Sequence, residues 1–318
     1  MDYEWPSEES RAQALQDGTF MPQNIEPIYI TVDGTRIFLS LKKFPGIPAS
    51  LVSLPTSSAS SASPKMTPIP SSWDTNKYEE WENCDKIDKA KGLEVDSVGR
   101  LWVLDETSYN SNCFAKLFIL DSTNDQTELI HRFPFRHFLD DLMLDETADG
   151  TFAYISRWGE NHIVVFNLEQ NESWKVDTPG IEVSSIALSP KKDQEQRQLY
   201  LSNFNKNELY SISVAALRDG IKTSNPVLIG QWSGRAERML MDNQGTLYAS
   251  FWRRNYLSSY DTLDPLSEEE DIFEVADLDF PWHFTFALDK NETLWMTLYN
   301  WESQPRYSLL KAASFGHV

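Results

Sequence analysis

Two stretches of the sequence, ERMLMDNQGTLYA at 237–249 and FTFALDKNETLWM at 284–296, follow one pattern. In each, an apolar run ends at an aspartate, a short polar turn follows, and a leucine and an aromatic residue open a second apolar run. Aligned on that pair, related segments lie at 30–41, 93–105, 142–156 and 186–203. The anchors are separated by 64, 51, 47, 48 and 47 residues, and they are Ile37, Leu101, Phe152, Leu199, Leu247 and Leu294. Six copies of one unit therefore make up most of the chain.

Each copy has the pattern of a β-hairpin. Apolar residues alternate as in a strand, and the turn carries Asp, Asn or Gly, which tolerate positive φ or bond their own backbone. A third strand is expected at 49–54, 115–121, 162–168, 208–214, 256–261 and 307–312. A fourth is expected at 128–135, 173–177, 226–232 and 272–278. The sequence predicts an all-β fold, a six-bladed β-propeller with four-stranded antiparallel blades.

The boundaries follow from the repeat. Independent sandwiches are excluded because one repeat is too short for a two-sheet core, so we expect a single domain over 1–318. The sixth copy ends after its third strand, and we expect residues 1–25 to supply the missing strand and close the ring. The low-complexity stretch PTSSASSASPKM at 55–66 is expected to be a flexible loop.

Charge and composition exclude several classes of function. The chain of 318 residues has 28 Lys plus Arg against 48 Asp plus Glu, a net charge of -20, which repels nucleic-acid backbones. The negative charge would attract cationic ligands weakly, or it serves only to keep the protein soluble. No apolar run reaches the ~20 residues of a membrane span. The start MDYEWPSEES lacks the features of a signal peptide, so we expect either a cytosolic protein or a chain that begins after a removed or omitted signal peptide.

The sequence contains no motif of a familiar cofactor site. GxSxG, Walker, GxGxxG and Cys/His-cluster patterns are absent, so we expect no cofactor and no metal. The two cysteines, Cys84 and Cys113, match no zinc spacing and are compatible with one disulfide or with two thiols.

Several phrases resemble the major royal jelly/yellow family. They occur in the family's order over nearly the whole chain, and they are DYEWPSEESRAQAL, GIPASL, GRLWVLDE, AKLFILD, TFAYISR, SWKVD, IALSP and GTLYASF. The resemblance implies a six-bladed propeller and a secreted, extracellular protein. Two sequons, at Asn171 and Asn291, fit secretion and are candidate glycosylation sites.

The cysteines depart from the family's usual pattern. The family commonly carries cysteines where this chain reads VDSVGRLW and ADGTFAY, whereas Cys84 and Cys113 match the other two common positions. The resemblance therefore implies a Cys84–Cys113 disulfide, and two reduced buried thiols are the alternative.

In a propeller, the starts of the first strands and the ends of the second strands share one rim, where function usually lies. These positions are polar, charged and aromatic, which suits a small ligand with a ring and an amine. The candidate ligand-binding residues are Asp140, Asp141, Ser184, Ser185, Asn203, Glu237, Arg238, Arg253, His283, Thr285 and Asn300. The alternative for each is an ordinary structural role, as a solvated carboxylate, an ion pair or a packed side chain.

The resemblance implies a ligand class. Salivary members of the family bind serotonin and catecholamines at one end of the channel, through segments matching SSIALSP, SGRAERMLMD and LYASFWRRN here. We therefore expect a small-molecule partner that is cationic and aromatic; the oligomeric state stays open.

Other functions stay open. Some yellow-family members convert dopachrome by tautomerisation, for which His283, Asp141 or Glu237 could be the base, so whether this protein is an enzyme is undecided. A lactonase-type metal site built from Glu94, Asp141 and Asn203 is a third reading, which the family phrases oppose. A structural secretory protein without a small ligand is the fourth.

Overall fold

The structure is a computed structural model that describes residues 1–61, 64–70, 83–108, 111–192, 196–220, 222–252, 254, 256–262, 270–274, 285–299 and 306–311. The chain divides into two compact units. Unit 1 comprises Met1–His137 and Phe284–Val318, and unit 2 comprises Phe138–His283. That the whole chain is one domain stays a prediction.

Unit 1 contains three sheets. Their strand orders are β1-β5-β4-β3-β2, β6-β7-β8-β9 and β22-β23-β24. The elements of unit 1 are β1 (Asp2–Tyr3), α1 (Glu8–Asp17), the 3₁₀ helix η1 (Pro22–Asn24), β2 (Pro27–Asp33), β3 (Arg36–Leu41), β4 (Leu51–Pro55), the 3₁₀ helix η2 (Thr56–Ser60), β5 (Lys65–Pro68), β6 (Lys89–Val95), β7 (Arg100–Glu106), β8 (Lys116–Asp121), β9 (Thr127–Arg132), β22 (Phe286–Leu288), β23 (Leu294–Tyr299) and β24 (Tyr307–Lys311).

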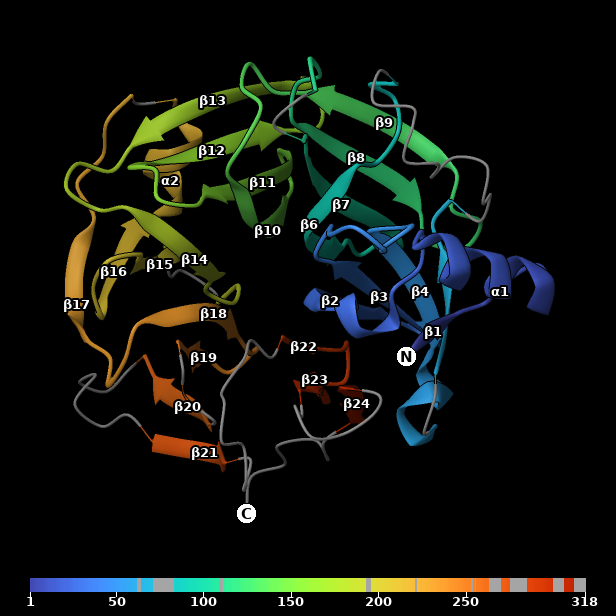
Figure 1. Ribbon diagram of the computed structural model, residues 1–318. Helices are drawn as coiled ribbons and strands as arrows, with labels where there is room; N and C mark the ends of the chain where they lie inside the picture. The colour runs from blue at the N-terminus through green and yellow to red at the C-terminus, as the bar shows by residue number, and fades with distance from the viewer. Residues whose placement is uncertain are drawn as a thin grey trace. The chain divides into compact units, whose positions relative to one another are not determined.

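Unit 2 also contains three sheets, each with four strands, in the orders β10-β11-β12-β13, β14-β15-β16-β17 and β18-β19-β20-β21 (Figure 1). Its elements are β10 (Leu139–Thr147), β11 (Gly150–Arg157), β12 (His162–Asn167), β13 (Glu172–Asp177), β14 (Val183–Leu188), β15 (Gln198–Asn203), β16 (Glu208–Ser213), α2 (Val214–Arg218), β17 (Val227–Gln231), β18 (Ala236–Met241), β19 (Thr246–Phe251), β20 (Tyr256–Asp261) and β21 (Glu270–Glu274).

The predicted fold class is confirmed: the protein is a six-bladed β-propeller. All strand pairs that continue from one strand to the next in sequence within a sheet are antiparallel, as the repeat predicts. Within unit 2, buried side chains join neighbouring sheets. Tyr154, Val165 and Ile186 belong to one apolar cluster, and Leu209, Met239 and Leu247 to the next.

The repeated aspartate has a structural reason. Asp289 Oδ1 accepts hydrogen bonds from the backbone of Asn291 (2.8 Å) and Thr293 (3.0 Å), and its Oδ2 accepts one from the indole of Trp295 (3.0 Å). Asp242 holds its own turn in the same way and accepts from the hydroxyl of Tyr248 (2.9 Å). In each of these two hairpins, one carboxylate thus closes the turn and orients the aromatic residue of the second strand.

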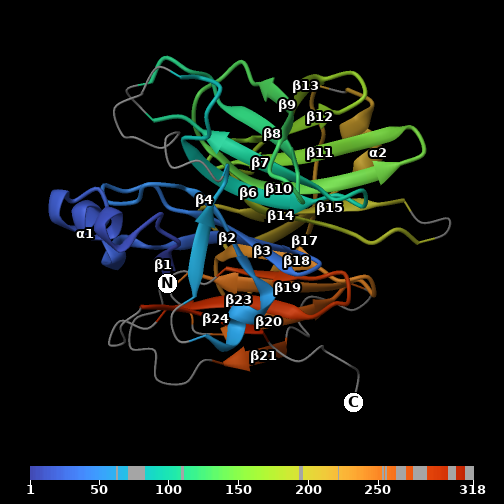
Figure 2. The ribbon, with the colours of Figure 1, turned by 90° about the vertical axis from the view of Figure 1, so that its right-hand side faces the viewer.

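The N-terminal segment lies in the first sheet. Strand β1 pairs in parallel with β5, with Asp2 opposite Lys65, and the hydroxyl of Tyr3 donates to the carbonyl of Ala49 at 2.7 Å. Figure 2 shows α1 at the side of that sheet, and the Arg11 side chain of α1 donates to Asp2 at 2.9 Å.

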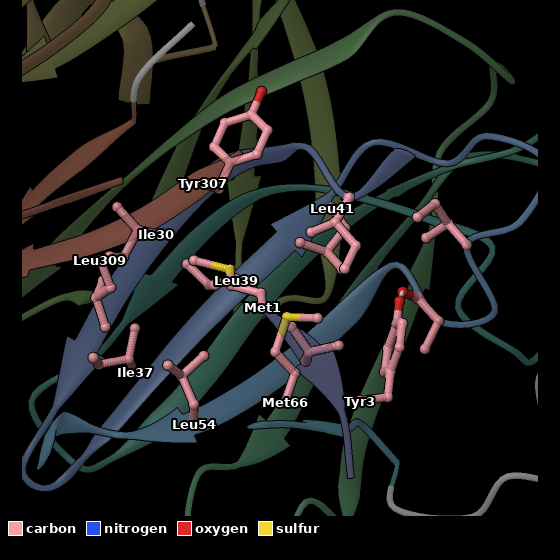
Figure 3. Close-up of a cluster of buried hydrophobic side chains, with 14 of the residues drawn as sticks. Met1, Tyr3, Ile30, Ile37, Leu39, Leu41, Leu54, Met66, Tyr307 and Leu309 are labelled. Carbon is pink, nitrogen blue, oxygen red and sulfur yellow. Dashed lines mark hydrogen bonds between the residues drawn. The ribbon is translucent and has the colours of Figure 1, made fainter. Parts of the chain in front are cut away.

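Tyr3 packs with Met1 and Met66 in the cluster of Figure 3. We expected residues 1–25 to provide the outer strand of the sixth sheet. Their one strand, β1, instead extends the first sheet, because Tyr3 and Met1 bury their side chains there. Residues 55–66, expected to be a loop, hold η2 and the start of β5 in the part that is described.

Candidate functional site

Several sequence-predicted site residues of unit 2 lie in β-bulges. The pairing of β10 with β11 shifts register between Leu139 and Leu142, so Asp140 and Asp141 occupy the irregularity. Ser184 and Ser185 occupy the corresponding shift between β14 and β15, and Glu237 the one between β18 and β19. A bulge redirects side chains and is common beside functional sites. We call this end of the three sheets the unit-2 rim.

Asp141 ties the three sheets of unit 2 together. Its Oδ2 accepts hydrogen bonds from the Ser185 hydroxyl (2.6 Å) and the Ile186 backbone (3.1 Å), both on β14. Its Oδ1 accepts one from the Leu142 backbone (3.0 Å) and pairs with the guanidinium of Arg238 on β18. Asp141 and Arg238 are both buried. The structure thus brings Asp141, Ser185 and Arg238 together, as the shared-rim argument predicts.

Hydroxyl groups extend this network. The Ser185 hydroxyl accepts from the Met239 backbone (2.8 Å), and the Ser184 hydroxyl shares a hydrogen bond with that of Ser202 (2.7 Å). Ser156 donates to the carbonyl of Ser184 at 2.7 Å. Because both oxygens of Asp141 already accept from protein donors, its evident role is to position neighbouring groups. Asp141 could act as a catalytic base only if some of these hydrogen-bond donors moved away from its carboxylate.

A row of aromatic residues, two exposed and one half-buried, follows the second strands of unit 2. Trp158, Phe204 and Trp252 come directly after β11, β15 and β19. Their backbone N–H groups donate to the residues just before the first strands, at 2.7, 2.6 and 2.9 Å, and those acceptors are Phe138, Glu182 and Arg235. The three positions are therefore equivalent in the three sheets. Trp158 is 49% exposed and Trp252 40% exposed, and we call these three residues the aromatic row.

A guanidinium lies within the aromatic row. The Cζ atom of Arg235 is 4.7 Å from the ring centroid of Trp252 and 5.1 Å from that of Phe204. Its Nη2 donates to Oε1 of Glu237 at 3.1 Å. The ring of Trp158 also packs edge to face with that of Phe204, at a centroid distance of 4.6 Å. Two aromatic faces and a carboxylate thus surround one positive charge.

A histidine lies near the aromatic row in sequence. The Nη1 of Arg157 lies 3.1 Å from Nε2 of His162, and its Nη2 lies 3.8 Å from the carboxylate of Glu160. Burial of His162, followed by the charges of Lys175 and Arg157, lowers its pKa to about 4. The ring is therefore neutral at physiological pH, and Nε2 accepts from the guanidinium.

The other sequence-predicted residues are spread more widely. Asn203 is buried and donates to Glu208 at 3.1 Å, and Asp140 is half-buried. Thr285 belongs to unit 1, is buried, and accepts through its carbonyl from the Thr297 backbone. Three candidates, Arg253, His283 and Asn300, lie outside the described residues.

Arg235 was missed by the sequence analysis. It lies one position before the start of β18, inside the segment SGRAERMLMD, but the candidate ligand-binding residues at this strand are Glu237 and Arg238. Its alignment with Phe138 and Glu182 in the other repeats was the available signal.

Unit 1 contains the predicted disulfide, Cys84–Cys113. The ammonium of Lys116 donates to the carbonyls of Cys84 (3.0 Å) and Lys86 (2.7 Å) and lies 3.0 Å from Oδ2 of Asp105. Oδ1 of Asp105 accepts from the Asp88 and Lys89 backbone at 2.7 and 2.8 Å. Burial raises the pKa of Asp105 to about 6, against the opposing charge of Lys116. The disulfide and this ion pair therefore anchor the same segment before β6.

Among the residues described, neither α-helix has the length and apolar character that a membrane span requires.

Comparison with known proteins agrees with the fold and the family phrases. The family model described as Major royal jelly protein matches residues 90–185. The chain is similar to Protein yellow of Drosophila melanogaster, at 24% identity over 71% of this chain and 48% of that protein. Protein yellow of Drosophila subobscura is 22% identical over 93% of this chain and 59% of its own length. The chain thus spans about half the length of the curated relatives it matches. Fold, family match and relatives together identify the chain as a relative of the major royal jelly protein/yellow family.

Proposed function

We propose that this protein is a secreted propeller that binds a small aromatic amine at the unit-2 rim. The observation that carries the proposal is the environment of the Arg235 guanidinium. Phe204 and Trp252 face it, and Glu237 pairs with it. That set of groups suits an organic cation, because aromatic faces attract positive charge and a carboxylate adds a charge-assisted hydrogen bond.

The rim also has the rigidity that a binding site needs. Arg238 and Glu237 are neighbours in β18, and Arg238 is fixed by the buried carboxylate of Asp141. Ser185 is held by that carboxylate and by the Met239 backbone. A site supported in this way loses little conformational entropy when a ligand binds. The net charge of -20 further favours the approach of cations at long range.

Secretion is the second part of the proposal. Disulfides persist mainly in oxidising compartments, and Cys84 and Cys113 form one. The asparagines of both sequons, Asn171 and Asn291, are exposed in turns, where a glycosyl transfer enzyme could reach them.

Isothermal titration calorimetry with dopamine and serotonin tests the binding proposal. We expect saturable heat for both amines and weaker binding by Glu237→Gln, which removes the carboxylate charge but keeps its shape. Catechol, which has the ring of dopamine without its amine, should bind more weakly than dopamine. No heat at millimolar amine would exclude amine binding by the wild-type protein and would favour a structural role.

A further inference from the structure

We propose that Arg235 is an internal competitor for the amine site: its guanidinium occupies the place of the ligand cation and must leave before that cation binds. This inference rests on the proposed function and adds the regulation of the same site. It also names Arg235 as a specificity-determining residue of that site.

The contacts of Arg235 are those that an organic cation would make. Its Cζ lies 4.7 Å from the Trp252 centroid and 5.1 Å from the Phe204 centroid, both within the ~6 Å range of a cation–π contact. Its Nη2 bonds the Glu237 carboxylate at 3.1 Å. A ligand cation placed between the same rings would meet the guanidinium at close range. The two positive charges therefore cannot share the site.

Displacement of Arg235 is feasible because, among the residues that the structure describes, its side chain is held by the contacts of the guanidinium with Glu237, Trp252 and Phe204, and the side chain is partly exposed. Its side chain keeps 29% of its exposure, and Trp252 is 40% exposed. The backbone anchor, from the Trp252 N–H to the Arg235 carbonyl, does not involve the side chain. Exposed ion pairs and exposed cation–π contacts are individually weak, so the guanidinium can move to solvent while the strands stay in place.

Arg235 contrasts with Arg238, three residues later. Arg238 is buried and paired with a fully buried carboxylate, so removing it from its site would leave a buried charge without its partner. Of these two arginines, Arg235 is therefore the one that can move, and Arg238 is the one that is fixed. This difference makes Arg235 the residue that sets how much of the amine's affinity is realised.

The expected effect is an increase in affinity when the competitor is removed. If the site is occupied by Arg235 in about ten molecules of every eleven, the apparent Kd is raised about tenfold. Arg235→Ala should therefore bind dopamine about tenfold more tightly than the wild type. Catechol, which has no cation to compete, should gain much less.

The experiment is calorimetric titration of dopamine and catechol into three proteins: the wild type, Arg235→Ala and Arg254→Ala. Arg254 is an exposed arginine two residues after Trp252, so its removal makes the same change in net charge. A gain for Arg235→Ala that exceeds the gain for Arg254→Ala, and that is larger for dopamine than for catechol, supports the inference. Trp252→Leu in the Arg235→Ala background should then abolish the gain, with circular dichroism showing that the fold is kept.

The outcomes separate this inference from the proposed function. If the wild type binds dopamine and Arg235→Ala binds it no more tightly than Arg254→Ala does, the site stands and the competitor is refuted. If only Arg235→Ala binds, the competitor is supported and the wild-type site is self-occupied. If neither binds, both proposals fail. An equal gain for catechol would show that Arg235 blocks the site by its bulk, which overturns a competition between charges.

Discussion

Replacing Asp141 by alanine should destabilise unit 2 more than any exposed substitution, because Asp141 is the carboxylate that joins three sheets. The change removes the acceptor of Ser185, Ile186 and Leu142 and leaves the Arg238 guanidinium buried without its carboxylate. Breaking a buried ion pair by removing one partner costs about 3–5 kcal/mol. We expect the free energy of unfolding to fall by about that amount.

A double variant separates the cost of the unpaired buried charge from the cost of the lost packing. When both partners of a buried pair are replaced by apolar residues of similar volume, stability is often retained. Asp141→Leu combined with Arg238→Met should therefore recover at least about 2 kcal/mol of the loss, even though it also removes the serine contacts. Asp149→Ala is the matched control, since Asp149 is exposed in the turn of the same hairpin, and it should change stability by less than about 0.5 kcal/mol.

Urea denaturation followed by tryptophan fluorescence measures these differences, since unit 2 contains five tryptophans, Trp158, Trp174, Trp232, Trp252 and Trp282. A shift of the midpoint at constant slope reports stability alone. The reasoning would be refuted if Asp141→Ala lay within about 1 kcal/mol of the wild type. It would also fail if the double variant were no more stable than Asp141→Ala.

Four other outcomes follow from the structure. Asp289→Ala should cost about 2–3 kcal/mol in urea denaturation, because two backbone N–H groups and the Trp295 indole lose their acceptor; a loss under 0.5 kcal/mol would argue against the turn-closing role. The pKa of His162 is about 4 in the fold and near 6.5 when unfolded, so protons bind the unfolded state more strongly between these values. His162→Gln should therefore gain about 3 kcal/mol relative to the wild type as pH falls from 6.5 to 4, and a pH-independent difference would contradict the burial of a neutral ring. Changing Cys84 and Cys113 to serine should lower stability by about 2–4 kcal/mol, whereas an unchanged melting temperature would show that Lys116 and Asp105 hold the segment alone. Protein from a eukaryotic secretory host should lose mass on treatment with peptide-N-glycosidase, and Asn291→Gln should remove part of that shift; identical masses before and after treatment would exclude glycosylation in that host.

The repeat predicted much of the fold because its cause is local. In the hairpins of Asp242 and Asp289, the aspartate before the turn bonds the backbone of that same turn, and the apolar alternation marks the buried faces of the strands. Both signals are contained within a dozen residues. The hairpins, their spacing and the fold class could therefore be inferred from sequence alone.

The placement of the N-terminus has a different origin. Strand β1 pairs with β5 because Tyr3 buries its ring and reaches the Ala49 carbonyl, a contact across 46 residues. No local pattern indicates which sheet edge a two-residue strand will join. The general rule that a propeller closes its ring predicted a strand in the sixth sheet. The packing of Tyr3 instead places β1 beside β5 in the first sheet.

The candidate site shows the same division. Counting strand starts placed Asp141, Ser185 and Arg238 at one rim, since equivalent positions in the repeats share one end of their sheets. It could not show that Arg238 pairs with a carboxylate 97 residues away, nor that Arg235 lies between Phe204 and Trp252. Those contacts depend on side-chain rotamers and on neighbouring sheets.

A crystal structure of the protein soaked with dopamine tests the central claim most directly. The account predicts ligand density with the amine nitrogen within ~6 Å of the ring centroids of Phe204 and Trp252. The same nitrogen should pair with Glu237, and the Arg235 side chain should have turned out to solvent. Density for the amine at any other place, or an unchanged Arg235 beside a bound amine, would contradict it.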